Sequence, residues 1–289
     1  MLILRDFGLS KSRFNIIKKM KSFISQENRK LSKLALYNVE DLSYSAFMKA
    51  LRKKDVKVNG KRVNKDVMIN IGDKVEIFYA QTDNAKFEEI YKDQNVLVIN
   101  KFSGYTSESV FEEIKTRYSN AGFIHRLDRN TSGIMIFSLN TTAETELLNG
   151  FKNKRFEKFY TAHVVGKMPK KKDLLTAYLL KDKESATVKI FNTQVKNSVL
   201  IKTGYEVLEG HADFSVLLVR LYTGKTHQIR AHLAHIGHAI IGDGKYGDFE
   251  INNKFREKSQ KLSATRLVLH FTENSPLNYL DNKTFTIKG

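Results

Sequence analysis

The chain has no cysteine and no tryptophan, and it has only two prolines among its 289 residues. The absence of cysteine excludes disulfide bonds, a cysteine-ligated zinc ion and a thiol nucleophile. The sequence also lacks a hydrophobic run long enough to cross a membrane as a helix, and it shows no signal peptide pattern. We therefore expect a cytoplasmic protein that uses no thiol chemistry and has no membrane partner.

Acidic residues are scarce relative to basic ones. The chain has 49 Lys and Arg against 31 Asp and Glu, a formal net charge of +18. Residues 1–80 alone hold 18 basic and 8 acidic residues, which is more than half of the excess. Such a cationic segment is typical of proteins that bind the phosphate backbone of a nucleic acid. An anionic membrane surface is the competing partner, but the lack of a long hydrophobic span and of a signal peptide argues against it.

The apolar content is sufficient for packed cores, because 41% of the residues are hydrophobic and 11% are aromatic. The length suits one large domain and one small domain. A polar stretch at residues 81–86 interrupts the apolar patterning and is the expected linker. We therefore predict a basic N-terminal region over residues 1–80 and a second domain over residues 85–289.

The N-terminal region has patterns of a small α+β module. Residues 1–28 have a rough apolar stripe at helical spacing, and residues 42–51 form a second amphipathic pattern. Asn59-Gly60, set between alternating valines, is a strong hairpin signal. Residues 69–77 then predict another tight turn and a strand.

This pattern resembles a known RNA-binding module. The stretch from Leu51 to Lys61, followed by Gly72-Asp73-x-Val75, is similar to the domain shared with a ribosomal small-subunit protein, here called the S-four-type domain. The resemblance covers about residues 29–80, with the first helix opening near Arg29. It implies that exposed cations of this module contact RNA, namely Arg52, Lys53, Lys54, Lys61 and Arg62.

The most informative stretch is His125-Arg126-Leu127-Asp128-Arg129-Asn130-Thr131-Ser132-Gly133, which precedes the apolar run 134–137. The apolar run predicts a buried strand, so the charged residues before it are expected at the mouth of that strand. A single aspartate among cations is stabilised in its ionised form, the state that a carboxylate nucleophile needs. A salt-bridged loop before a core strand is the alternative interpretation.

Four stretches in the same order resemble the RluA-type pseudouridine synthases. Residues 125–133 are similar to the catalytic motif of that family, residues 90–104 to its first motif, and Lys158-Phe159-Tyr160 to its Lys-x-Tyr strand. Residues 223–247 match its last long motif. The chain departs from the family at Phe102, where a proline is usual. The resemblance implies an α+β fold in which a mixed, largely antiparallel sheet carries a central cleft.

The resemblance also implies roles for site residues. Asp128 would be the catalytic carboxylate and Arg230 its ion-pair partner, while Tyr160 would offer a ring for uracil and a hydroxyl for proton transfer. Arg126, with His125 beside it, would help to extract the target base from its stack. Whether Asp128 attacks the ribose or promotes a glycal intermediate is left open. A buried tyrosine and structural salt bridges are the alternatives for these residues.

The resemblance also implies the partners of the protein, and three alternatives stand beside it. The family implies RNA as substrate, most of all 23S-type large-subunit ribosomal RNA, with no cofactor and no metal, and we expect a monomer. Transfer RNA or messenger RNA is an alternative substrate, and a non-catalytic RNA-binding or ribosome-assembly factor is an alternative function. A metal-dependent RNA hydrolase is a third, because four histidines lie close together in the sequence. They are His227, His232, His235 and His238.

Overall fold

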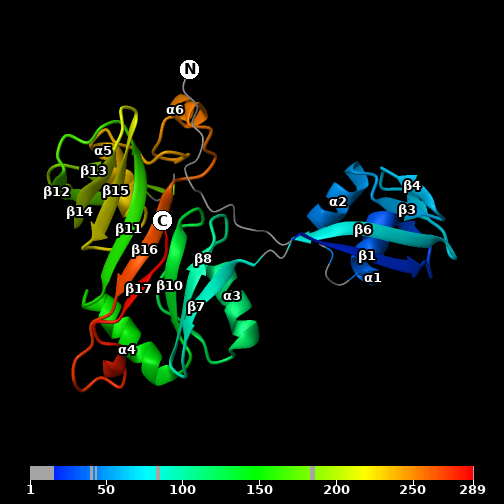
Figure 1. Ribbon diagram of the computed structural model, residues 1–289, viewed down its shortest axis with the longest axis horizontal. Coiled ribbons are helices and arrows are strands. Elements are labelled where there is room, and N and C mark those ends of the chain that lie inside the picture. Colours follow the sequence, from blue (N-terminus) through cyan, green and yellow to red (C-terminus); the bar gives the residue numbers. More distant parts are fainter. Residues whose placement is uncertain (1–15, 40–41, 43, 83–84, 183–185, 289) are drawn as a thin grey trace. The chain divides into compact units, whose positions relative to one another are not determined.

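The computed structural model describes residues 16–39, 42, 44–82, 85–182 and 186–288. The chain divides into two compact units, of which the first ends at Ala85 and the second begins at Lys86 (Figure 1). Each unit has its own hydrophobic core. No helix among these residues is long and apolar enough to span a membrane.

The first unit is a small α+β module. A four-stranded antiparallel sheet has the strand order β1-β6-β3-β4, and β2 pairs with β5. Leu31, Phe47 and Ile77 are fully buried in its core. Its elements are β1 (Ile16–Ile24), β2 (Arg29–Lys30), α1 (Leu31–Asn38), α2 (Tyr44–Arg52), β3 (Val56–Val58), β4 (Lys61–Val63), β5 (Met68–Ile69) and β6 (Lys74–Thr82).

The helix expected over residues 1–28 is wrong where the structure describes the chain. Residues 16–24 form strand β1, which pairs with β6 along its whole length, and residues 1–15 lie outside the described residues. Met20 and Ile24, two apolar residues of the expected helical stripe, are more than half exposed. A short apolar run is compatible with the side-chain period of a helix and with that of a strand, and here the pairing with β6 makes the segment a strand. The second helix and the Asn59-Gly60 hairpin are confirmed.

The second unit is built on one eleven-stranded sheet. Nine strands follow the order β13-β12-β14-β15-β11-β16-β10-β8-β7, while β17 pairs with β16 and β9 pairs with β10. All pairs are antiparallel except β10 with β16, which confirms the predicted mixed, largely antiparallel sheet. Its strands are β7 (Phe87–Lys92), β8 (Val96–Lys101), β9 (Gly122–Phe123), β10 (Ser132–Ser138), β11 (Glu157–Val165), β12 (Lys172–Asp182), β13 (Thr187–Phe191), β14 (Val199–Gly210), β15 (Phe214–Leu221), β16 (Leu262–Val268) and β17 (Thr284–Thr286).

Helices cover both faces of the central strands (Figure 1). Alternate residues of β10 enter different clusters: Met135 packs with residues of α3, whereas Ile136 packs with residues of α4. Because both faces are buried, the strand shows a continuous apolar run instead of alternation. The helices are α3 (Ser107–Arg117), α4 (Thr141–Lys152), α5 (Gln228–His235) and α6 (Phe249–Lys254), with a 3-10 turn, η1, at Asn278–Leu280.

The parallel junction of β10 and β16 depends on a glycine. Gly133 pairs with Ala264 and has φ +120°, and a Cβ there would lie 2.4 Å from the Ala264 backbone. Any other residue would force the two strands apart. The junction lies directly after the Asp128 loop, and β11 is the next strand beyond β16. The sheet therefore places the Asp128 loop two strands away from Tyr160 on β11.

Candidate active site

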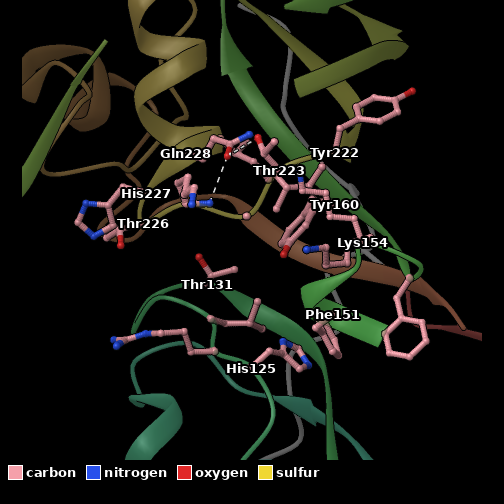
Figure 2. A pocket seen from close by; sticks show the side chains of 18 of the residues that line it. His125, Thr131, Phe151, Lys154, Tyr160, Tyr222, Thr223, Thr226, His227 and Gln228 are labelled. Atoms are coloured by element: carbon pink, nitrogen blue, oxygen red, sulfur yellow. Dashed lines mark hydrogen bonds between the residues drawn. The ribbon is translucent and has the colours of Figure 1, made fainter. Parts of the chain in front are cut away.

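The second unit contains a cavity of about 980 Å³ beside the central strands (Figure 2). Five residues predicted for the site lie in its wall, namely His125, Arg126, Asp128, Tyr160 and Arg230. They come from the loop before β10, from β11 and from α5. The fold therefore brings together side chains that are up to about a hundred residues apart in the sequence.

The Asp128 carboxylate is held by an arginine that a second aspartate holds in turn. The Arg230 Nη1 donates a hydrogen bond of 2.8 Å to Asp128 Oδ2. Its Nε and Nη2 donate to the two carboxylate oxygens of Asp243, at 2.7 and 2.8 Å. This bidentate contact fixes the plane of the guanidinium group, and the orientation of the Nη1 that faces Asp128 is fixed with it.

Asp243 lies within the motif at residues 223–247, for which the sequence predicted no role of this aspartate. The carboxylate is fully buried, and its Oδ1 also accepts from the backbone N–H groups of Lys245 and Tyr246. Burial raises the pKa of Asp243, but Arg230 and these N–H donors outweigh it, so the pKa is lowered overall. Likewise the two aspartates outweigh burial and raise the pKa of Arg230. Arg230 and Asp243 therefore remain charged together.

Tyr160 contributes a buried ring with its hydroxyl at the cavity. The side chain is 7% exposed, and Figure 2 shows its hydroxyl turned into the cavity on the side of Thr131. Burial, and then the charge of Asp128, raise the pKa of the Tyr160 hydroxyl. The group is therefore protonated at neutral pH and can act as a hydrogen-bond donor to a ligand.

His125 ties the Asp128 loop to the sheet. Its Nε2 accepts a hydrogen bond of 3.1 Å from the Ile136 N–H on β10, and its ring stacks on Phe151 with a centroid separation of 4.5 Å. Burial, and then the nearby Lys158, lower the pKa of His125 to about 3. The imidazole is therefore neutral at physiological pH, as its acceptor role requires.

Arg126 has a more exposed position than its neighbours. Its side chain is 70% exposed and forms an ion pair with Glu108 at 3.2 Å. Because an exposed ion pair of this kind contributes little to stability, Arg126 can leave Glu108 at small cost. The guanidinium group is thus both at the cavity and free to move.

A buried lysine supports the other end of the Asp128 loop. The Lys101 ammonium donates to the carbonyl groups of Phe102, Tyr105 and Arg129 at 2.8 to 3.1 Å. Burial lowers its pKa to about 8, although the charge of Asp128 opposes that shift. The contact with the Arg129 carbonyl fixes the backbone one residue after Asp128. No motif in the sequence predicted this role of Lys101.

The four clustered histidines each have a hydrogen-bond partner inside the protein. His227 contacts the Tyr246 hydroxyl, His232 the Thr203 hydroxyl, His235 the Asn192 side chain and His238 the Val165 carbonyl. Among the described residues there is no group of three or more His, Asp or Glu arranged to hold a metal ion. The metal-hydrolase hypothesis therefore has no ligand set in this part of the chain.

The five cations predicted to bind RNA in the N-terminal module belong to the first unit and do not line the cavity. Three of them follow one another at the end of α2, and two lie on β4 of the hairpin. All are exposed to solvent, namely Arg52, Lys53, Lys54, Lys61 and Arg62.

Comparison with known proteins decides the family. Residues 90–235 match the family model described as RNA pseudouridylate synthase. The chain is 30% identical to ribosomal large subunit pseudouridine synthase C of Vibrio parahaemolyticus, over 80% of this chain and 79% of that protein. The chain belongs to the RNA pseudouridylate synthase family. The synthase is also 29% identical to ribosomal large subunit pseudouridine synthase D of Pasteurella multocida, over 78% of this chain and 75% of that one.

Solved structures agree with this assignment. The synthase superposes on human RNA Pseudouridylate Synthase Domain Containing 1 with a TM-score of 0.58 and 25% identity, covering 71% of this chain and 91% of that chain. The recognition of an RluA-type enzyme and the predicted activity are thereby confirmed: the synthase isomerises uridine in RNA to pseudouridine. The family assignment favours an enzyme over a non-catalytic RNA-binding factor.

Proposed function

We propose that the synthase modifies uridines of large-subunit ribosomal RNA, with Asp128 as its catalytic carboxylate. One observation carries the assignment of Asp128: it lies in the cavity wall, hydrogen-bonded to an arginine that a buried second aspartate orients. The substrate class is supported by relatives named ribosomal large subunit pseudouridine synthases C and D.

The reaction makes defined demands on these side chains. The bond between N1 of uracil and C1′ of ribose breaks, the base turns, and C5 then bonds to C1′ while C5 loses its proton and N1 gains one. An ionised carboxylate serves either as nucleophile at C1′ or as the base that promotes a glycal, and the Arg230 guanidinium donates a hydrogen bond to the Asp128 carboxylate. Tyr160 offers its ring face to the freed base and its hydroxyl as a donor.

Arg126 and His125 would act in extraction of the target nucleotide. Flipping a base costs a few kcal/mol, and a mobile guanidinium plane that stacks in the vacated position offsets part of that cost. Arg126 is exposed and weakly paired, which suits this movement, whereas His125 holds the loop that carries it.

The N-terminal unit would deliver the RNA. Its helix–hairpin arrangement and its resemblance to the S-four-type domain support backbone binding through Arg52, Lys53, Lys54, Lys61 and Arg62. Because Asp128, Tyr160 and Arg230 all come from one chain, a second copy is not needed to complete the site, and we expect a monomer acting on ribosomal RNA in the cytoplasm.

The test is pseudouridine mapping of total RNA from cells that carry the intact chain, Asp128→Asn, or a deletion. We expect the same large-subunit ribosomal RNA sites to be lost in the variant and in the deletion, with the variant protein still folded. Sites lost only from transfer RNA or messenger RNA would refute the substrate proposal. Retention of every site in Asp128→Asn would refute the role of Asp128.

A further inference from the structure

Two lysines line the wall of the cavity: Lys154, in the turn that joins α4 to β11, and Lys158, near the start of β11. The arginines of the wall have acidic partners: Arg126 pairs with Glu108, Arg220 with Glu157 at 3.1 Å, and Arg230 with Asp128. Neither lysine forms an ion pair with any residue that the structure describes. The cavity therefore contains positive charge that the protein itself leaves uncompensated.

Lys154 occupies a backbone position that favours glycine. Its φ is +57°, and it follows the C-cap Asn153 of α4. The N–H of Lys154 donates to the Phe151 carbonyl, and the N–H of Arg155 donates to the Gly150 carbonyl, which together form a Schellman motif. A residue with a Cβ is strained in this left-handed conformation, and such strain is concentrated at functional sites.

Packing holds the turn in this conformation. The Phe156 ring lies so close to Gly150 that a Cβ on that glycine would come within 2.1 Å of it. Phe156 also makes edge contacts with Phe151 and Phe271, with centroids 5.1 and 5.2 Å apart. The backbone that carries Lys154 is therefore rigid, and Figure 2 shows its side chain at the cavity on the side of Tyr160.

Lys158 lies farther inside. Its Nζ is 5.6 Å from the centre of the Phe151 ring, and a Cβ on Gly224 would approach it within 3.2 Å. Burial, and then the like charge of Lys154, lower the pKa of Lys158. The same ammonium lowers the pKa of His125, which is next to the predicted base-flipping arginine. An anion bound between the two lysines would relieve this repulsion.

We infer that Lys154 and Lys158 form a subsite for a backbone phosphate of the RNA beside the target uridine. The inference rests on the proposed function, since the same cavity must hold that uridine. A cavity of about 980 Å³ has room for more than one nucleotide, and the occupant that an RNA enzyme brings is a polyanion. The packed turn carries Lys154 and strand β11 carries Lys158, so the backbone positions of both charges are set before binding and little ordering is required when the RNA arrives.

A lysine near a helix C-terminus has another explanation, because it also interacts favourably with the helix dipole. The chain offers a matched control for this. Arg256 follows α6 with φ +55°, and its turn repeats the two hydrogen bonds of the Lys154 turn, from Arg256 to Asn253 and from Glu257 to Asn252. Arg256 is exposed and does not line the cavity. Arg256 has the same backbone conformation and the same charge as Lys154, but it does not lie at the cavity.

The experiment compares Lys154→Gly, Arg256→Gly, Lys158→Gln and Lys158→Arg in the full chain. Binding of fluorescein-labelled octauridylate is measured by anisotropy between 50 and 200 mM KCl, and melting temperatures by circular dichroism. We expect Lys154→Gly and Lys158→Gln to weaken binding about fivefold each, with the salt dependence reduced by about 0.7 in log–log slope per lost contact. Arg256→Gly and Lys158→Arg should bind as wild type does.

Both glycine variants should melt at or above the wild-type temperature, because glycine relieves the left-handed strain. Lower RNA affinity in a protein that is no less stable would separate ligand binding from a structural role. The inference is overturned if Lys154→Gly binds with wild-type affinity and slope, or if Arg256→Gly loses as much. Octauridylate binding requires no turnover, so a wild-type chain that bound the probe but made no pseudouridine would refute the proposed function alone.

Discussion

At the scale of single residues, the position of the Asp128 carboxylate depends on a side chain that does not touch it. Asp243 accepts hydrogen bonds from Nε and Nη2 of the Arg230 guanidinium, and Nη1 is left to donate to Asp128. Its own oxygens are fixed by backbone N–H groups of the following turn. Asp243 is therefore a positioning residue: it aims Arg230, and Arg230 aims Asp128.

We expect Asp243→Asn to lower kcat about 10- to 100-fold with little change in KM, because a misplaced catalytic group slows the chemistry without weakening RNA contacts. The free energy of unfolding should fall by about 2–4 kcal/mol, since a buried arginine loses one of two charged partners. Steady-state kinetics and urea unfolding measure both. Asp248→Ala, which removes the side-chain N-cap of α6, is the control: it should reduce stability and leave kcat unchanged. Equal kcat in the two variants would contradict the role of Asp243.

At the scale of elements, the Asp128 loop is held at both ends by side chains that substitute for regular backbone pairing. The Lys101 ammonium donates a hydrogen bond to the carbonyl of Arg129, the residue after Asp128. On the other side of Asp128, the His125 ring accepts a hydrogen bond from the N–H of Ile136, which directly precedes the residues of β10 that pair with β9. Gly133 then allows β10 to approach β16 closely enough for the parallel pair. The loop is therefore set by its neighbours and not by its own secondary structure.

The His125 contact predicts how stability depends on pH. The folded-state pKa is about 3, whereas an unfolded chain titrates near the ordinary 6.5. On acidification the unfolded state takes up a proton that the folded state does not, so stability falls as pH drops below about 6.5, by at most about 1.4 kcal/mol per unit. Urea unfolding at pH 7, 6 and 5 should show a shallower decline in His125→Asn, whose side-chain oxygen retains an acceptor. An unchanged slope would exclude His125 as a source of the dependence.

At the scale of the whole molecule, excess positive charge is concentrated in the first 80 residues, away in the sequence from the side chains that we propose as catalytic. Three of the predicted RNA contacts follow one another at the end of α2, and all are exposed. Phosphate contacts of this kind supply affinity and make it sensitive to salt, but they do not read sequence. The N-terminal unit should therefore affect binding and not the chemical step.

We expect the triple change Arg52→Gln, Lys53→Gln and Lys54→Gln to raise KM about tenfold, to flatten the dependence of affinity on salt, and to preserve kcat at saturating RNA. Pseudouridine formation on transcribed large-subunit ribosomal RNA, at two salt concentrations, measures this. The matched control changes Lys170, Lys171 and Lys172, which are exposed in the second unit. A similar rise in KM for both triple variants would indicate that only net charge matters.

The sequence by itself determined the elements and motifs that depend on neighbouring residues. The buried strand after Asp128, the Asn59-Gly60 hairpin and helix α2 follow from local periodicity and turn chemistry. Asp128, Tyr160 and Arg230 were predicted from motif resemblance, and the structure places them in one cavity wall. Residues 16–24 were misassigned because a short apolar run fits two periods and only pairing with β6 distinguishes them.

Only the tertiary structure decided which distant side chains meet. Asp243 and Lys101 acquire their roles from partners on other elements, and no local pattern marks a buried charge as oriented or paired. Lys154 resembles any surface lysine in the sequence, and its significance comes from its place on a left-handed turn beside the cavity, where no described residue forms an ion pair with it. The physical reason is that burial and charge pairing depend on distances in space, which a chain acquires only when it folds.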